Sequence, residues 1–340
     1  MIKNRAIATW LFAVSFLVVV MVVYGGWVRL TRAGLSIVEW APVTGVIPPT
    51  SLRAWDQAFE AYRQTEEYRQ VHQSLTLEQF RFLYYMEYGH RLLGRLTGLA
   101  FLVPLVVFVA RGDILRPRLR AFVAVALLFA LQGVLGWLMV KTGLAGLPHV
   151  SHLSLTLHLG AALLLLAACL WLGFGYAIGQ PRPEQPRVPG AIRRLSLVAL
   201  VVTSLQLLAG GLVAGLRAGY LSDTFPKMMG QWIPDGLGRL SPLVANLLDN
   251  PAAVHFQHRW FAFVVLAVAA VLNRRARLEL LPPYLRGGAK ALLHLTSLQI
   301  LVGVGLIAMH VPRWMASLHQ TIGIAILAAA LFTCHRAFRS

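Results

Sequence analysis

The sequence predicts an all-α, polytopic membrane protein whose eight transmembrane helices form two pseudo-symmetric four-helix bundles. Of the 340 residues, 57% are hydrophobic and only 13% are charged, whereas soluble domains usually carry about 25% charged residues. The apolar residues form stretches of roughly twenty, long enough to cross a hydrocarbon core of ~30 Å. Several motifs also occur twice in the same order. Together these observations argue against a water-soluble protein.

The eight helices are expected in apolar segments at 8–28, 82–110, 119–140, 153–177, 192–216, 253–273, 288–309 and 314–336. The first segment is longer than a typical signal-peptide core and has no small-residue cleavage site. We therefore expect it to remain as a transmembrane helix. The longest loop, 29–77, should form one or two surface helices between Trp55 and Gln73.

Basic residues gather in alternate loops. They are Lys3, Arg5, Arg111, Arg116, Arg118, Arg120, Arg182, Arg187, Arg193, Arg194, Arg274, Arg275, Arg277, Arg286, Lys290, Arg336 and Arg339. With eight helices, all of these loops fall on one side of the membrane. The positive-inside rule makes that side cytoplasmic, so we expect both termini in the cytoplasm of a bacterial cell with the protein in its inner membrane. The same distribution explains the formal net charge of +18 without a nucleic-acid partner.

The sequence contains an internal repeat. The matched elements are Gly25-Gly26 with Gly210-Gly211, Arg32-Ala33-Gly34 with Arg217-Ala218-Gly219, His90-Arg91 with His258-Arg259, Leu131-Gln132 with Leu298-Gln299, and Leu157-His158 with Leu318-His319. A proline-rich linker near 180–187 separates the predicted halves, 1–180 and 190–340. Because each half has an even number of helices, both halves should share one orientation in the membrane.

Four of the eleven histidines occupy repeated positions inside apolar segments, namely His90, His158, His258 and His319. Each lies roughly 10 Å below the outer membrane surface, counted along its predicted helix. Polar groups at this depth usually face the interior of a bundle, and neutral imidazoles from two facing helices can hold haem iron. We predict two haem sites, with interhelical hydrogen bonding as the alternative. His255, one turn before His258, is an alternative ligand.

Charged residues lie in the same layer. Glu87, one turn from the first of these histidines, is a catalytic candidate because a carboxyl in apolar surroundings suits proton transfer. Its alternative role is a salt bridge to Arg91 or Arg95 without chemistry. Arg91, Arg95 and Arg259 are candidates for binding haem propionates, or they are helix-end residues that reach water. The position equivalent to Glu87 is His255, so we expect the first half to hold the working site and the second half a fixed redox centre.

Several of these segments are similar to signatures of the haem A synthase family. The resemblance rests on Gly25 to Trp40 with Pro48-Pro49, on Met86 to Arg95, on Gln132 to Val140 and on Phe256 to Arg259. It covers nearly the whole chain.

The resemblance implies oxidation of the C8 methyl group of haem O to a formyl group, which yields haem A for cytochrome oxidase. It implies substrate haem at His90 and His158, and a haem b cofactor at His258 and His319. Glu87 matches the family's essential glutamate.

The two cysteines, Cys169 and Cys334, lie in apolar segments, and the outer loops have none. The chain therefore resembles the branch of the family that lacks an outer cysteine pair, as in proteobacteria and mitochondria. Haem O synthase, an electron acceptor of unknown identity and further copies of this chain are candidate partners.

Two rival functions remain compatible with the four histidines. One is a diheme cytochrome b that exchanges electrons with quinol, and the other is a haem carrier. The intramembrane Glu87 and its asymmetry with His255 favour chemistry on one haem. Haem O supplied to the protein would be converted only by an enzyme.

Overall fold

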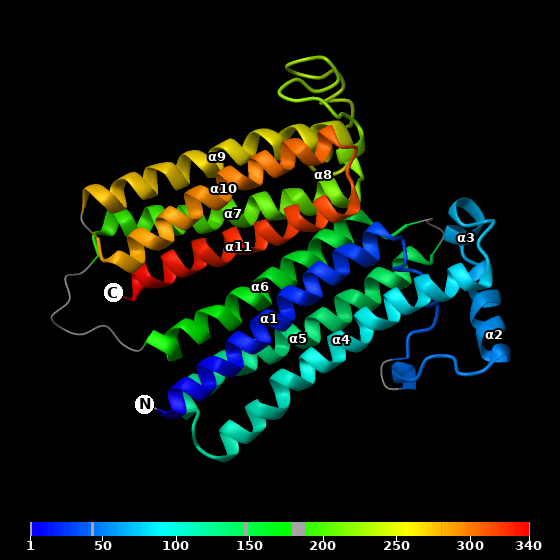
Figure 1. The fold of residues 1–340 in the computed structure, drawn as a ribbon, viewed down its shortest axis with the longest axis horizontal. Helices are drawn as coiled ribbons and strands as arrows, with labels where there is room; N and C mark the ends of the chain where they lie inside the picture. Colours follow the sequence, from blue (N-terminus) through cyan, green and yellow to red (C-terminus); the bar gives the residue numbers. More distant parts are fainter. Residues whose placement is uncertain (1, 42–43, 146–148, 179–187, 280, 340) are drawn as a thin grey trace. The chain divides into compact units, whose positions relative to one another are not determined.

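The computed structural model describes residues 2–41, 44–145, 149–178, 188–279 and 281–339. Within these ranges the chain is helical, and the described part has no β-strand beyond one isolated bridge, between Met228 and Gln231. The long helices are α1 (Ile2–Leu30), α4 (Leu77–Ala110), α5 (Arg116–Gly143), α6 (His152–Ile178), α7 (Gly190–Gly215), α9 (Pro251–Leu278), α10 (Pro283–Ala308) and α11 (Arg313–Phe338) (Figure 1). The short ones are η1 (Thr44–Val46), α2 (Leu52–Arg63), α3 (Glu66–Val71), η2 (Ala218–Tyr220) and α8 (Ala245–Leu248).

Each predicted apolar segment coincides with one of the eight long helices, with at most one residue beyond the helix end, so the predicted helix positions are confirmed. Among the described residues, seven helices are long and apolar enough to cross a membrane: α1, α4, α5, α6, α7, α10 and α11. The remaining long helix, α9, has 28 residues and carries several polar side chains near its N-terminal end, His255, Gln257, His258 and Arg259. The protein is therefore a multi-pass membrane protein.

The surface of the long helices is apolar. Phe16, Val106, Leu127 and Leu301 are each more than 60% exposed, although large hydrophobic side chains are normally buried in soluble proteins. Lipid chains are the natural contact for such residues, and a helix satisfies its own backbone hydrogen bonds in that setting.

Helix ends follow the local sequence. Thr76 and Gln79 form a capping box at the start of α4, and Asn250 accepts hydrogen bonds from the first amides of α9. After α1 and α7, the equivalent residues Arg32 and Arg217 adopt left-handed backbone angles, with φ of 56° and 54°. The internal repeat therefore extends to the backbone conformation of these turns.

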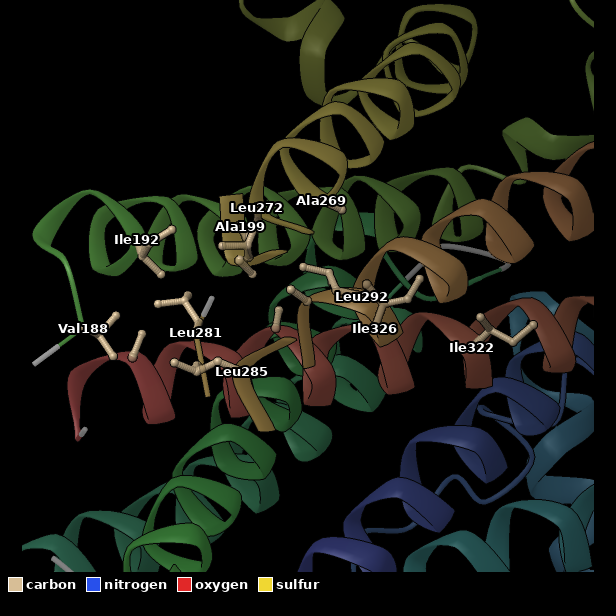
Figure 2. Packing of buried hydrophobic residues seen from close by; sticks show 14 residues of the cluster. Val188, Ile192, Ala199, Ala269, Leu272, Leu281, Leu285, Leu292, Ile322 and Ile326 are labelled. Carbon is tan, nitrogen blue, oxygen red and sulfur yellow. The ribbon is translucent and has the colours of Figure 1, made fainter. Parts of the chain in front are cut away.

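The chain divides into two compact units, one of residues 16–165 and one of residues 1–15 with 166–340. In the second unit, α7 and α10 each pack against both α9 and α11. Small and branched side chains fill the space between these four helices (Figure 2), including Ile192, Ala199, Leu272, Leu285 and Ile326. The predicted boundary between the halves falls near 180–187, which lies outside the described residues.

In the unit of residues 16–165, the two predicted surface helices are confirmed as α2 and α3. An aromatic cluster attaches α2 to the start of α4, where Phe59 and Tyr62 stack on Phe80 with ring centroids 4.9 and 5.3 Å apart. Trp55 meets Phe80 edge-on at 6.5 Å. Such pairs add about 1 kcal/mol each beyond the burial of their area, so the cluster holds this segment firmly on α4.

A buried acid lies in this segment. Glu67 on α3 is only 4% exposed, and its Oε2 atom has no hydrogen-bond partner. Burial, and to a lesser extent the charge of Glu87, raise the pKa of Glu67 to about 8, although Arg32 and the hydrogen bond from Tyr62 lower it. The folded protein therefore favours the protonated form of Glu67.

We expect Glu67→Gln to flatten the dependence of thermal stability on pH between about 4.5 and 8. In that interval the unfolded chain releases the proton while the folded chain keeps it, so the wild-type protein loses stability as pH rises. The loss ends above pH 8, where both states are ionised. The measurement is Tm in detergent at pH 5 and pH 8 for both proteins. Equal changes in Tm would contradict the role assigned to Glu67.

Candidate functional site

Two histidines face each other in the unit that holds α7, α9, α10 and α11. His258 on α9 and His319 on α11 have ring centroids 6.4 Å apart, with an interplanar angle of 67°. Metal–imidazole bonds are about 2 Å long, so one metal between two imidazole nitrogens sets the ring centres roughly 6 Å apart. The observed spacing fits a single iron atom between the two rings. His258, rather than His255, is the ring opposite His319.

The other predicted pair lies in the unit of residues 16–165. His90 on α4 and His158 on α6 are close enough to interact electrostatically. The ring of His90 also meets Tyr24 of α1 edge-on, at 5.9 Å between centroids. The Nδ1 atoms of His158 and His319 are buried and have no hydrogen-bond partner among the residues that the structure describes. A buried polar atom without a partner is costly, which points to a ligand or a small rearrangement on binding.

Each of the four imidazoles lies against a glycine on the preceding long helix. A Cβ atom added at Gly25 would lie 3.0 Å from Nε2 of His90, and one at Gly210 would lie 3.2 Å from Cε1 of His258. The corresponding distances at the other two sites are 3.6 Å from Gly136 to His158 and 3.0 Å from Gly303 to His319. We call these four glycines the glycine seats. A side chain there would push the ring out of place at the closest contacts.

Glutamines accompany three of the four seats. One turn before the glycine, the side-chain Nε2 atom donates to the main-chain carbonyl of the histidine that uses the seat. The distances are 3.3 Å from Gln132 to His158, 2.9 Å from Gln206 to His258 and 2.9 Å from Gln299 to His319. The roles of the seats and of Gln206 were not predicted from the sequence. Three of the four seats share a signal that could have found them, the spacing Gln-x-x-x-Gly in helices α5, α7 and α10.

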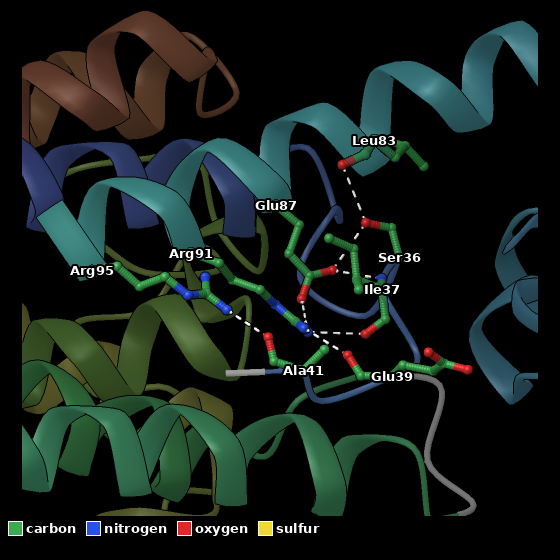
Figure 3. Close-up of polar contacts among 8 residues, drawn as sticks. All are labelled: Ser36, Ile37, Glu39, Ala41, Leu83, Glu87, Arg91 and Arg95. Atoms are coloured by element: carbon green, nitrogen blue, oxygen red, sulfur yellow. Dashed lines mark hydrogen bonds and ion pairs between the residues drawn. The ribbon is translucent and has the colours of Figure 1, made fainter. Parts of the chain in front are cut away.

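Glu87 is held in a polar network between α4 and the loop that follows α1 (Figure 3). Its Oε2 atom accepts from the main-chain N–H of Ile37 at 2.8 Å and lies 2.9 Å from the Ser36 hydroxyl. Its Oε1 atom pairs with Arg91. The Ser36 hydroxyl also lies 3.1 Å from the carbonyl oxygen of Leu83. The predicted salt bridge from Glu87 to Arg91 is therefore present, and the carboxyl is 3% exposed overall.

The predicted arginines bind loop carbonyls in both units. Arg91 donates to the carbonyl oxygens of Ile37 and Glu39, each at 2.9 Å, and Arg95 donates to that of Ala41 at 2.8 Å (Figure 3). Each side chain thereby ties residues 37–41 to α4. We call such an arrangement, a helix arginine that binds loop carbonyls, an arginine clamp.

The second unit repeats the arginine clamp. Arg259 donates to the carbonyl oxygens of Ser222 and Thr224, at 2.9 and 2.7 Å. Its Nε atom donates to Nε2 of His255 at 2.9 Å. His255 therefore occupies the place that Glu87 occupies beside Arg91. The difference is chemical, because a carboxyl is replaced by an imidazole.

Arg91→Gln should destabilise the protein more than Arg259→Gln. Removal of Arg91 leaves the buried Glu87 without its cation, which typically costs about 3 kcal/mol or more. Removal of Arg259 costs mainly hydrogen bonds to a neutral histidine and to carbonyls, about 1–2 kcal/mol. Thermal unfolding in detergent measures the difference. The double variant Glu87→Gln with Arg91→Gln should recover part of the loss, and its failure to do so would contradict the assignment.

The sequence matches known proteins over nearly its whole length. Residues 8–331 match the family COX15-CtaA, described as cytochrome oxidase assembly protein. The heme A synthase of Nitrosospira multiformis is 38% identical, over 98% of this chain and 93% of that protein. The heme A synthase of Methylobacterium radiotolerans is 40% identical over 96% and 89% of the two chains. Heme A synthase COX15 of Bos taurus is 36% identical over 97% and 81%. The chain therefore belongs to the COX15-CtaA family of cytochrome oxidase assembly proteins.

Proposed function

We propose that this protein is a haem A synthase, which oxidises the C8 methyl group of haem O to a formyl group and so acts as an oxidoreductase on a C–H bond. The observation that carries the proposal is the difference between two otherwise matching sites. Both have a histidine pair and an arginine clamp, but only the first has a carboxyl, Glu87, beside its arginine. The names of the relatives support the same activity.

In this proposal His258 and His319 hold the haem b cofactor. The 6.4 Å between their ring centres suits one iron, and the unpartnered Nδ1 of His319 leaves that ring able to donate to a neighbour on ligation. When bound, the haem supplies one-electron redox chemistry. His90 and His158 bind the substrate haem in the other half.

Conversion of a methyl to a formyl group takes one oxygen atom from water and releases four protons and four electrons (R–CH3 + H2O → R–CHO + 4 H+ + 4 e−). The electrons pass to an external acceptor, and Glu87 accepts one of the protons. Arg91 stabilises the carboxylate before the transfer. After the transfer, the protonated carboxyl can donate to the Ser36 hydroxyl, which in turn can donate to the carbonyl of Leu83. The network thus suits Glu87 in both protonation states, as a proton acceptor requires.

The arginine clamps set the positive charge of the outer layer. Arg91, Arg95 and Arg259 each donate hydrogen bonds to carbonyl oxygens of the loops. We propose that the same guanidinium groups attract the haem propionates by charge while they hold the loops in place. Propionate binding and loop binding are compatible because a guanidinium group has five N–H donors.

We further propose that α9 is the eighth membrane-spanning helix and that the halves 1–180 and 190–340 each form a four-helix bundle. α9 packs between α7 and α10, which are both long and apolar enough to cross the membrane. Eight spans put every strongly basic loop on one side, so both termini lie in the cytoplasm of a bacterial cell with the protein in its inner membrane.

Glu87→Gln should keep bound haem and stop haem A formation, because ligation survives while proton transfer is lost. The test expresses the full chain with a source of haem O and analyses extracted pigments by chromatography and mass spectrometry. Glu78→Gln is the matched control, since Glu78 is exposed at the start of the same helix, and it should form product normally.

Product from Glu87→Gln at the wild-type level would remove Glu87 from the mechanism. Only unchanged haem O from the wild-type chain would instead favour a diheme cytochrome b, the function to which the near-identity of the two sites also points.

His258→Ala or His319→Ala should abolish the low-spin b-type absorption spectrum, because one axial ligand is lost. His255→Ala should retain it, since that ring bonds to Arg259. His294→Ala, at an exposed position on α10, is the control. A normal spectrum in either ligand variant would contradict the assignment of haem b to this pair.

A further inference from the structure

The four glycine seats are not equivalent. At the seats of Gly136, Gly210 and Gly303, a glutamine one turn earlier holds the carbonyl of the seated histidine. At the seat of Gly25 the corresponding residue is Met21. Its terminal methyl group points to another part of α4, where it would lie 3.4 Å from a Cβ at Gly94. The amide that the other three seats share is therefore missing beside His90.

Two of the glutamines also carry an oxygen that could accept a hydrogen bond from the ring of the seated histidine. The Oε1 atoms of Gln206 and Gln299 are buried and have no hydrogen-bond partner within the described part of the chain. Nδ1 of His258 lies 3.2 Å from the amide nitrogen of Gln206, so a small turn of that amide brings its oxygen into range. A metal-bound imidazole almost always donates its second N–H to an acceptor, which fixes the ring plane.

His90 has a different environment. Its ring lies against Gly25 and meets the edge of Tyr24, and its hydrogen-bond partner is the main chain of Met21. The equivalent main-chain group of Gln206 also serves His258. His258 therefore has the same main-chain contact and the glutamine in addition, whereas His90 has the main-chain contact alone.

We infer that Gln132, Gln206 and Gln299 are positioning residues that hold three of the four haem-binding histidines by the main-chain carbonyl of each, and that Met21 leaves His90 as the ligand that releases haem. The inference rests on the proposed function, because it requires haem between each histidine pair. The difference between the two sites would explain how one site releases haem while the other retains it, which the histidine ligands alone do not explain. Substrate haem must enter and product haem must leave one site, while the cofactor haem stays in the other.

A reciprocal exchange of residues tests the inference. Gln206→Met gives the cofactor side the residue found at the substrate side, and Met21→Gln does the opposite. The measurement is the rate at which haem leaves the purified full-length protein for apomyoglobin. Loss from the first half is measured in a His319→Ala background, and loss from the second half in a His158→Ala background. Gln70→Met, at an exposed position on α3, is the control for the glutamine change.

We expect Gln206→Met to speed haem loss from the second half by about twofold to tenfold, the effect of one ordinary hydrogen bond. Met21→Gln should slow haem loss from the first half by a similar factor. The largest g value in the electron paramagnetic resonance spectrum should change in Gln206→Met, because it depends on the angle between the imidazole planes. If these residues only supported the fold, the two substitutions would not change the rates of haem loss in opposite directions.

Wild-type rates and g values in both variants would overturn the inference and leave the proposed function intact. If Gln206→Met fails to fold, Met21→Gln decides alone, and an unchanged rate in it rejects the inference. Absence of any low-spin haem spectrum in the wild-type protein would reject the proposed function together with the inference. The two failures are therefore distinguishable.

Discussion

A buried imidazole needs space and hydrogen-bond partners in a helix bundle that excludes water, and the long helices of this protein are arranged around that requirement. Space comes from the glycine seats, where the neighbouring helix carries no side chain that could displace the ring. Glutamines one turn earlier on that helix hold three of the four histidines by their main-chain carbonyls. Because a seat and its glutamine are four residues apart, both lie on one face of their helix. The same helix face therefore determines both how the neighbouring helix packs and where its histidine lies.

The sequence predicted the positions of all eight long helices because their apolar segments are long and uninterrupted. It also predicted one or two surface helices in the first loop, from the polar stretch between Trp55 and Gln73, and the structure has two there. The membrane-spanning character of α9 does not follow from composition in the same way, since His255, His258 and Arg259 reduce its hydrophobicity. These polar residues are compatible with a spanning helix because they face inward contacts rather than lipid.

For the site, sequence reasoning found the residues that carry unusual chemistry and missed those that carry shape. Four histidines, one intramembrane carboxyl and three arginines stand out in apolar segments. Glycines are common in membrane helices, so Gly210 and Gly303 do not stand out until a ring is seen against them. The loop carbonyls bound by Arg91 and Arg259 were also invisible, because a main-chain oxygen leaves no mark in the sequence.

The arginine clamps have a consequence for how this protein can change over time. Arg91 and Arg259 grip main-chain carbonyl oxygens, and every amino acid provides one. The clamp on residues 37–41 therefore places no demand on the side chains at the carbonyls it binds, so substitutions there can leave the course of the loop over α4 unchanged. In the second unit Ser222 and Thr224 also bond through their side chains, which restricts that loop more. Sequence change in residues 37–41 can thus remodel the surface of this loop without disturbing Glu87 and His90 on α4.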